Sequence, residues 1–390
     1  MTRTLCAALL LVFSTKAGAS LPASNVSAVA RAGLCLSGRA IPSIFLLGVA
    51  KCGTTSLFGQ IRALAPGLLV AKPAPGRPTW EDKEVNFFTR DYRDYNKGMT
   101  AYAALFPACS AERLGKHAID ATPGYIECPA VAERIYRSYA PDLRPQLRFM
   151  AILRDPVSRL RSWFDHMVRK VKPDLPADAW ATMGLSEIID CARRRKIDPR
   201  VGALLFASNC AQPIVAGLYA PQIMKFVSRF AASQIAIIGF KGYVARTEHV
   251  LSHLQTFLGL PMGLGGPAAA QIDSSRADAR AAVRGQINAS RPPLADAVAS
   301  GDGGQPRQML EAIHKNGAVH HIRKGEGMST FGPRASTALD AFYKPHIREL
   351  GEMLLRRARP HSQGGLLVLP TDVVPANGGT PESVTHALFA

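Results

Sequence analysis

The chain has 390 residues, 47% of them hydrophobic, so it is long enough to bury a sizeable core in one large domain or two smaller ones. Its 47 Lys and Arg residues outnumber 29 Asp and Glu, and the net charge of +18 favours an anionic partner. Nucleic acid is not expected as that partner. The basic residues are scattered, only 7% of the chain is aromatic, and no helix-turn-helix, zinc-finger or RNA-binding signature is present. A nucleotide cosubstrate or an acidic polysaccharide fits the charge.

The first predicted element is a secretory signal over residues 1–19. Arg3 precedes a short apolar run, and an A-x-A site ends at Ala19. The run is well short of the ~20 apolar residues that a spanning helix needs, so we expect cleavage after Ala19 and no stable transmembrane span. A buried N-terminal helix is the alternative. The sequons at Asn25 and Asn288 suit a secretory route.

Cysteine usage agrees with an oxidising compartment. The cysteines after the signal are Cys35, Cys52, Cys109, Cys128, Cys191 and Cys210. None of them forms a C-x-x-C pair, so a zinc site is not expected. Two disulfides are candidates, Cys109 with Cys128 and Cys191 with Cys210, although the sequence does not determine the connectivity.

Residues 20–40 are expected to be a flexible lead, and residues 41–358 to form one α/β domain. Apolar patterns predict strands at 43–49, 147–153 and 235–240 and helices at 55–64, 157–167, 217–230, 246–258 and 335–356. Strands that alternate with helices predict a mainly parallel sheet covered on both faces, a P-loop-like three-layer α/β/α fold. An insertion is expected at 172–210, a loop-rich stretch at 261–322, and a disordered tail at 359–390.

The strand at 43–49 is followed by GVAKCGTTS, which has the residue types of a phosphate-binding loop. A turn from a strand into a helix directs backbone N–H groups at an anion above the helix N-terminus. The common nucleotide loop carries its lysine after the second glycine, whereas Lys51 precedes Gly53 here. The candidate binding residues are Lys51, Cys52, Gly53, Thr54, Thr55 and Ser56. The alternative is an ordinary glycine turn with a surface lysine.

The order K-x-G-T-T-S after a strand resembles the 5′-phosphosulfate loop of sulfotransferases that use 3′-phosphoadenylyl sulfate (PAPS). The likeness is greatest to Golgi carbohydrate sulfotransferases of the heparan sulfate and chondroitin 4-sulfate 6-O types, and covers roughly residues 43–260 and 323–350. It implies transfer of a sulfuryl group from PAPS to a hydroxyl or amine of an anionic carbohydrate, such as a glycosaminoglycan. It also implies release of 3′-phosphoadenosine 5′-phosphate (PAP), a place in the Golgi lumen or outside the cell, and no required metal.

A second motif, ILRDPVSRLRSW, resembles the family's strand–RDP–helix motif, in which an arginine and a serine eight residues later hold the 3′-phosphate. Arg154 and Ser162 take these positions. A guanidinium forms forked, charge-assisted hydrogen bonds to phosphate, and the serine lies about two helical turns further on nearly the same face. The alternative is a plain ion pair between Arg154 and Asp155 at a helix start.

A third motif, KEVNFF at 83–88, resembles the family's K-E-x-x-F-F segment, whose glutamate is thought to be the general base. Glu84 takes that position and could accept the acceptor's proton, while Lys51 neutralises charge on the bridging oxygen. Asp120, in IDATPGY, is a rival base, because the family's T-P-x-Y segment lines the acceptor cleft. The alternative for Glu84 is a surface carboxylate paired with Lys83 or Lys97.

A fourth motif, HHIRKGEGM at 320–328, resembles the R-K-G segment that closes over the 3′-phosphate and adenine in cytosolic sulfotransferases. Arg323, Lys324 and Gly325 are the matching residues. Two other functions stay open: a P-loop nucleotide kinase, which the lysine order disfavours, and a secreted glycan-binding protein with an inactive sulfotransferase fold. These motifs concern binding of the cosubstrate, and they determine neither the acceptor nor the position that is sulfated.

Overall fold

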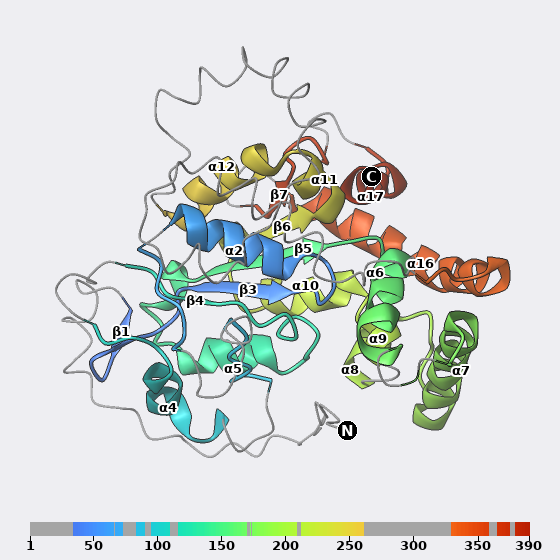
Figure 1. Ribbon diagram of the computed structural model, residues 1–390, viewed down its shortest axis with the longest axis horizontal. Helices are drawn as coiled ribbons and strands as arrows, with labels where there is room; N and C mark the ends of the chain where they lie inside the picture. Colours follow the sequence, from blue (N-terminus) through green and yellow to red (C-terminus); the bar gives the residue numbers. More distant parts are fainter. Residues whose placement is uncertain are drawn as a thin grey trace, which may run out of the picture.

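Five short apolar segments form one parallel β-sheet in the computed structural model of the protein (Figure 1). The strand order is β4-β3-β5-β6-β7, where the strands are β3 (Ile44–Gly48), β4 (Ile119–Asp120), β5 (Arg148–Leu153), β6 (Ile235–Gly239) and β7 (Leu367–Leu369). β3, β5 and β6 are apolar almost throughout and buried, as strands of a parallel sheet are when helices cover both faces. The predicted α/β class and the three predicted strands are confirmed.

The structure describes residues 34–65, 67–72, 83–89, 95–109, 116–169, 172, 174–208, 212–260, 329–358, 365–374 and 379–390. The predicted signal, both sequons, the whole loop-rich stretch at 261–322, and Arg323, Lys324 and Gly325 lie outside these ranges. Within them, no helix combines the length and the apolar character needed to cross a bilayer.

Helices cover both faces of the sheet (Figure 1). They include α2 (Thr54–Leu64), α4 (Gly98–Ala104), α5 (Val131–Ser138), α10 (Tyr219–Val227), α11 (Phe240–Ala245), α12 (Thr247–Leu258), α16 (Pro333–Arg357) and α17 (Pro381–Phe389), with short 3₁₀ turns η3 (Arg144–Gln146) and η5 (Ala232–Gln234). On one face, the Tyr243 hydroxyl of α11 donates to Gln60 of α2 at 2.5 Å. On the other, Tyr136 of α5 meets Phe230, just after α10, with ring centroids 5.8 Å apart. These are the two outer layers of the predicted three-layer fold.

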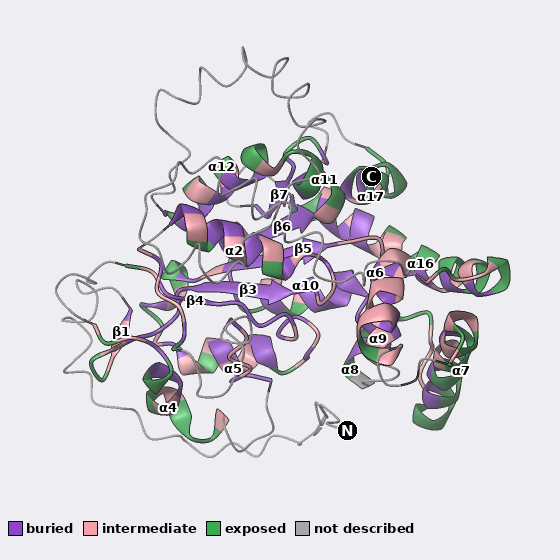
Figure 2. Cartoon of the chain, in the orientation of Figure 1, coloured by how far each residue is buried: buried purple, intermediate pink, exposed green. Residues whose placement is uncertain are grey.

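A second hydrophobic cluster is built from helices alone. Its helices are α6 (Pro156–Trp163), α7 (Ala177–Arg195), α8 (Gly202–Ser208), α9 (Gln212–Val215) and the first half of α16. Leu160, Phe206 and Leu339 are buried at its centre. The predicted insertion at 172–210 is therefore largely helical, and Figure 2 shows α7 exposed on its outer side.

The prediction of a disordered tail at 359–390 is wrong for the parts that the structure describes. β7 pairs in parallel with β6 and completes the sheet. α17 packs against α16 and α11 and buries Val384 and Leu388. Each piece is too short to show a clear apolar period in the sequence, and both are stabilised by packing against the rest of the domain.

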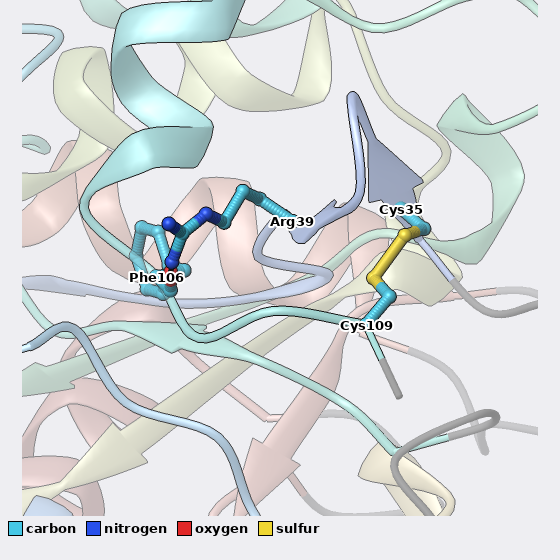
Figure 3. The surroundings of a disulfide bond; sticks show 4 residues. All are labelled: Cys35, Arg39, Phe106 and Cys109. Carbon is cyan, nitrogen blue, oxygen red and sulfur yellow. Dashed lines mark hydrogen bonds between the residues drawn. A yellow bond between two sulfur atoms is a disulfide. The ribbon is translucent and has the colours of Figure 1, made fainter. Parts of the chain in front are cut away.

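The prediction of a flexible lead at 20–40 is also wrong for the last residues of that range. The strands β1 (Cys35–Leu36) and β2 (Arg39–Ala40) form a small antiparallel hairpin. A disulfide joins Cys35 to Cys109, and Arg39 donates to the carbonyl of Phe106 beside it (Figure 3). The disulfide and this hydrogen bond therefore hold the hairpin against the body of the domain.

The disulfide predicted between Cys109 and Cys128 is wrong. Cys109 lies beside the hairpin, where its N–H donates to the carbonyl of Gly38 at 2.9 Å, and its sulfur pairs with Cys35. Cys128 is buried and is not in a disulfide. Cys191 is disulfide-bonded, whereas its predicted partner, Cys210, lies outside the described residues.

Candidate active site

The predicted phosphate loop connects β3 to α2 at the carboxyl edge of the sheet. The N–H of Val49 donates to the carbonyl of Ile152 in β5 at 3.0 Å, and the N–H of Cys52 turns back to the carbonyl of Val49 at 3.2 Å. Ligands of open parallel sheets bind at the carboxyl ends of the strands. The loop therefore lies where a ligand is expected.

Gly53 ends this loop as the N-cap of α2. Its φ of +94° is accessible to glycine at little cost, and a Cβ at this position would lie only 2.8 Å from the ring of Phe240. No side chain caps α2, so the N–H groups of its first turn, at Thr54, Thr55 and Ser56, are not used by a cap. This close backbone approach and the exposed helix dipole suit an anion.

Arg154 follows β5 directly and also lies beside Phe240. Its guanidinium is 5.0 Å from the centre of that ring, and its carbonyl accepts a hydrogen bond from the Tyr219 hydroxyl at 2.7 Å. Within the described ranges, no carboxylate lies within ion-pair distance of the Arg154 guanidinium. Lys51, Gly53 and Arg154 are thus brought to one edge, with the Phe240 ring close to both Gly53 and Arg154.

The pKa of the buried Cys52 thiol is set by its burial and by the charges around the loop. Burial raises its pKa to about 12, opposed by the nearby positive charges of Arg159 and Arg154. A thiol with this pKa stays protonated at neutral pH, so Cys52 serves packing rather than nucleophilic chemistry.

The helix that carries the predicted serine begins with a side-chain cap. Asp155 accepts the N–H of Ser158 at 2.7 Å, which gives it a capping role instead of the alternative ion pair with Arg154. Ser162 is half-buried in the last turn of α6, immediately before a π-helical turn, η4 (Phe164–Val168). In the part of the chain that the structure describes, no hydrogen bond joins the Ser162 hydroxyl to Arg154.

Glu84 lies beside the loop and is paired with Lys83. The Lys83 side chain is buried, whereas Glu84 is 35% exposed, so the pair is more than a contact between two surface side chains. Burial raises the pKa of Glu127 and the Glu84 charge adds to this, while the Glu127 Oε1 accepts the N–H of Ala50 in the loop at 3.2 Å. Glu84 is therefore close to Glu127, which contacts the loop, and is partly open to solvent.

Asp120, the rival base, is closed to an acceptor. It is fully buried and accepts hydrogen bonds from the hydroxyls of Tyr102, Thr122 and Tyr125, each at 2.7 Å. Burial raises its pKa to about 6, against the opposing effect of these hydroxyls. This arrangement makes Asp120 a structural carboxylate.

Two neighbours of the loop, Phe240 and Glu127, were not singled out from the sequence. Phe240 directly follows β6, as Arg154 follows β5, so the rule that ligands meet the carboxyl ends of parallel strands could have found it. No sequence pattern marks Glu127, because it lies in the segment between β4 and α5 and meets the loop only through tertiary packing.

Comparisons with known proteins agree on one family. Residues 42–278, more than half of the chain, match the family described as "Sulfotransferase domain". A bifunctional heparan sulfate N-deacetylase/N-sulfotransferase 1 of Caenorhabditis elegans is 25% identical over 226 residues, which is 57% of this chain and 22% of that protein. The bifunctional heparan sulfate N-deacetylase/N-sulfotransferase 3 of Homo sapiens is 28% identical over 222 residues, 56% of this chain and 22% of that protein.

The chain thus spans less than a quarter of the length of these curated relatives. Among solved structures, a sulfotransferase from Alicyclobacillus acidocaldarius aligns with a TM-score of 0.46 and 21% identity, over 82% of this chain and 98% of that chain.

Proposed function

This chain belongs to the sulfotransferase domain family, and from that premise we propose that it transfers a sulfuryl group to a hydroxyl or amine of a carbohydrate. Family membership implies PAPS as the donor. The observation that carries the proposal is the convergence of the Lys51 loop, the open first turn of α2 and Arg154 around Phe240. N–H groups and a separate cation beside one ring fit a donor that carries phosphate at both its 5′ and 3′ positions.

The residues divide into a donor-binding set and a reacting pair. Gly53, Thr54, Thr55 and Ser56, with the backbone of Cys52, would hold the 5′-phosphosulfate. Arg154 and Ser162 would hold the 3′-phosphate, and Arg323, Lys324 and Gly325 are proposed to complete that end. When bound, PAPS supplies the activated sulfuryl group.

Glu84 and Lys51 form the reacting pair. Glu84 would accept the proton that the acceptor hydroxyl or amine loses, since it is near the loop and partly exposed. Lys51 would neutralise the charge that develops on the bridging oxygen of the departing PAP. Neither role requires a metal.

The acceptor is proposed to be an anionic, glycosaminoglycan-like polysaccharide. Two observations support this: the relatives are heparan sulfate enzymes by name, and the chain carries a net charge of +18. The Cys35–Cys109 disulfide supports folding in the secretory pathway, with the Golgi lumen or the extracellular space as its destination.

Binding of PAP tests the proposal. In a thermal-shift titration without metal, PAP should raise the melting temperature of the wild-type chain, and ATP should not. A ligand at 100 times its dissociation constant stabilises a protein by about 2.7 kcal/mol, which is readily measured. Arg154→Ala should lose most of the PAP shift, because it removes the forked cation from the 3′-phosphate side.

The alternatives give different results in the same titration. A shift with ATP that needs magnesium would favour a nucleotide kinase. A well-folded chain that ignores PAP but is stabilised by heparin would favour a glycan-binding protein with an inactive sulfotransferase fold.

A further inference from the structure

The phosphate loop is held by the stretch from Pro123 to Glu127, which begins inside the IDATPGY motif and ends at a glutamate that no motif marks. The N–H of Ile126 donates to the carbonyl of Leu47 at 3.0 Å. A side chain at Gly48 would collide with the carbonyl oxygen of Pro123. One step further, Glu127 accepts the N–H of Ala50 at 3.2 Å. The segment therefore runs alongside the end of β3 and the start of the loop and contacts both.

Lys51 needs such support, because its backbone is strained. Its φ is +71°, a left-handed conformation that costs a non-glycine residue roughly 1–2 kcal/mol. Strained residues persist where the surrounding structure holds them. The amide of Ala50, directly before Lys51, is held by a side chain, and that side chain is Glu127.

A buried positive charge lies near this contact. Arg159 is completely buried, and one of its N–H groups donates to the carbonyl of Pro213. Its Nε and Nη1 have no hydrogen-bond partner among the described residues, and Glu127 is the carboxylate whose charge acts on it. A buried guanidinium is costly without a nearby negative charge, so Arg159 favours ionised Glu127.

Opposing effects thus act on the pKa of Glu127. Burial raises its pKa, and the Glu84 charge adds to that, whereas Arg159 and the Ala50 N–H lower it. A hydrogen bond from an amide to an ionised carboxylate is shorter and stronger than one between neutral groups.

We propose that Glu127 is a positioning residue for the phosphate loop: its carboxylate holds the Ala50 N–H and thereby sets the place of Lys51, with Arg159 as its buried counter-charge. This inference rests on the proposed function, because it assigns the loop to the 5′-phosphate of the donor. It assigns Glu127 no contact with the donor itself.

Two ligands separate a local effect on the loop from a general loss of structure. PAP carries both phosphates, whereas adenosine 3′-monophosphate lacks the 5′-phosphate that the loop would bind. Calorimetry on the purified chain should show that Glu127→Ala weakens PAP binding about tenfold, or 1.4 kcal/mol, while the affinity for adenosine 3′-monophosphate changes less than about twofold.

Three further variants sharpen the test. Glu127→Gln keeps an oxygen within reach of the Ala50 N–H, so its PAP affinity should fall by no more than about threefold, whereas the shorter Glu127→Asp should behave like Glu127→Ala. Glu133→Ala, which removes an α5 carboxylate bound by Arg137 and Arg229, is the matched control and should leave both affinities unchanged. If Glu127→Ala does not fold, the comparison of Gln with Asp carries the test.

The outcomes are distinguishable. Equal losses for both ligands, or an unchanged PAP affinity in Glu127→Ala and Glu127→Asp, would overturn the positioning role while leaving the proposed function intact. A Gln variant as weak as the Asp variant would overturn the hydrogen bond to Ala50 as the cause. A wild-type chain that binds no PAP would overturn the proposed function and this inference with it.

Discussion

Glu84 and Asp120 show how the surroundings of a carboxylate decide what it can do. Asp120 is fully buried and uses both of its oxygens for three hydroxyl donors, so it has no free face for an acceptor. Glu84 is partly exposed, paired with the buried Lys83, and close to the loop. The sequence showed two acidic residues in motif positions, and only the packing around them separates a candidate base from a structural group.

Asp120 should make stability depend on pH in an unusual direction. Its pKa in the folded chain is about 6, above the ordinary value of 3.8, so the unfolded chain loses this proton first as the pH rises. The wild-type free energy of unfolding, minus that of Asp120→Asn, should therefore fall between pH 4 and pH 6 by on the order of 2–3 kcal/mol. Urea unfolding of both proteins across this range measures it. A difference that stays constant with pH would mean that Asp120 has an ordinary pKa.

The proposed role of Glu84 as general base predicts a loss of turnover in Glu84→Gln. It should lower kcat by about 100-fold or more, because a glutamine cannot accept the acceptor's proton, while PAP binding changes little. The assay is PAP release from PAPS with de-N-sulfated heparin and with chondroitin as acceptors. Full turnover of either acceptor by Glu84→Gln would place the base elsewhere.

Among the strands, those that carry the site were predictable and the two at the edges of the sheet were not. β3, β5 and β6 are apolar runs of five or six residues, which is a readable pattern. β4 has two residues and β7 three, too few to show any period. Arg154 was found because a motif marked it, whereas Glu127 reaches the loop through tertiary packing that no local pattern encodes.

The loop between β3 and α2 should not tolerate a side chain at Gly53. Gly53→Ala adds a Cβ at 2.8 Å from the Phe240 ring and also strains a φ of +94°. Gly259, with a φ of +65° and open space around it, is the matched control for the strain alone. Gly259→Ala should cost about 1 kcal/mol of stability and leave PAP binding intact, while Gly53→Ala should cost more and also weaken PAP binding.

Urea unfolding and PAP titration of the two alanine variants measure both effects. Equal stability losses, with PAP binding unchanged in both, would show that the contact between Gly53 and Phe240 has no part in shaping the site.

At the scale of the whole molecule, the C-terminal residues belong to the fold. Leu388 of α17 is fully buried, and its carbonyl lies against Gly239 at the end of β6. α17 also meets Gly351 of α16 through the backbone of Pro381. The site edge of the sheet is thus covered by the last helix of the chain.

Leu388→Ala tests this covering role. Truncation of a buried leucine typically costs about 2–5 kcal/mol, so the variant should show a clearly lower free energy of unfolding. Glu382→Ala, on the exposed side of the same helix, should change it by less than about 0.5 kcal/mol. Chemical denaturation of both variants measures the difference. A Leu388→Ala chain as stable as the wild type would mean that α17 is only loosely attached.

The position of β7 also has a consequence for synthesis. β6 finds its neighbour on one side only when Leu367–Leu369 has been made, long after Ile235–Gly239 itself. Until then an apolar parallel strand presents an open edge, and such edges invite pairing with other chains. Chaperones that shield the nascent chain therefore have an open strand edge to protect from the synthesis of β6 until that of β7.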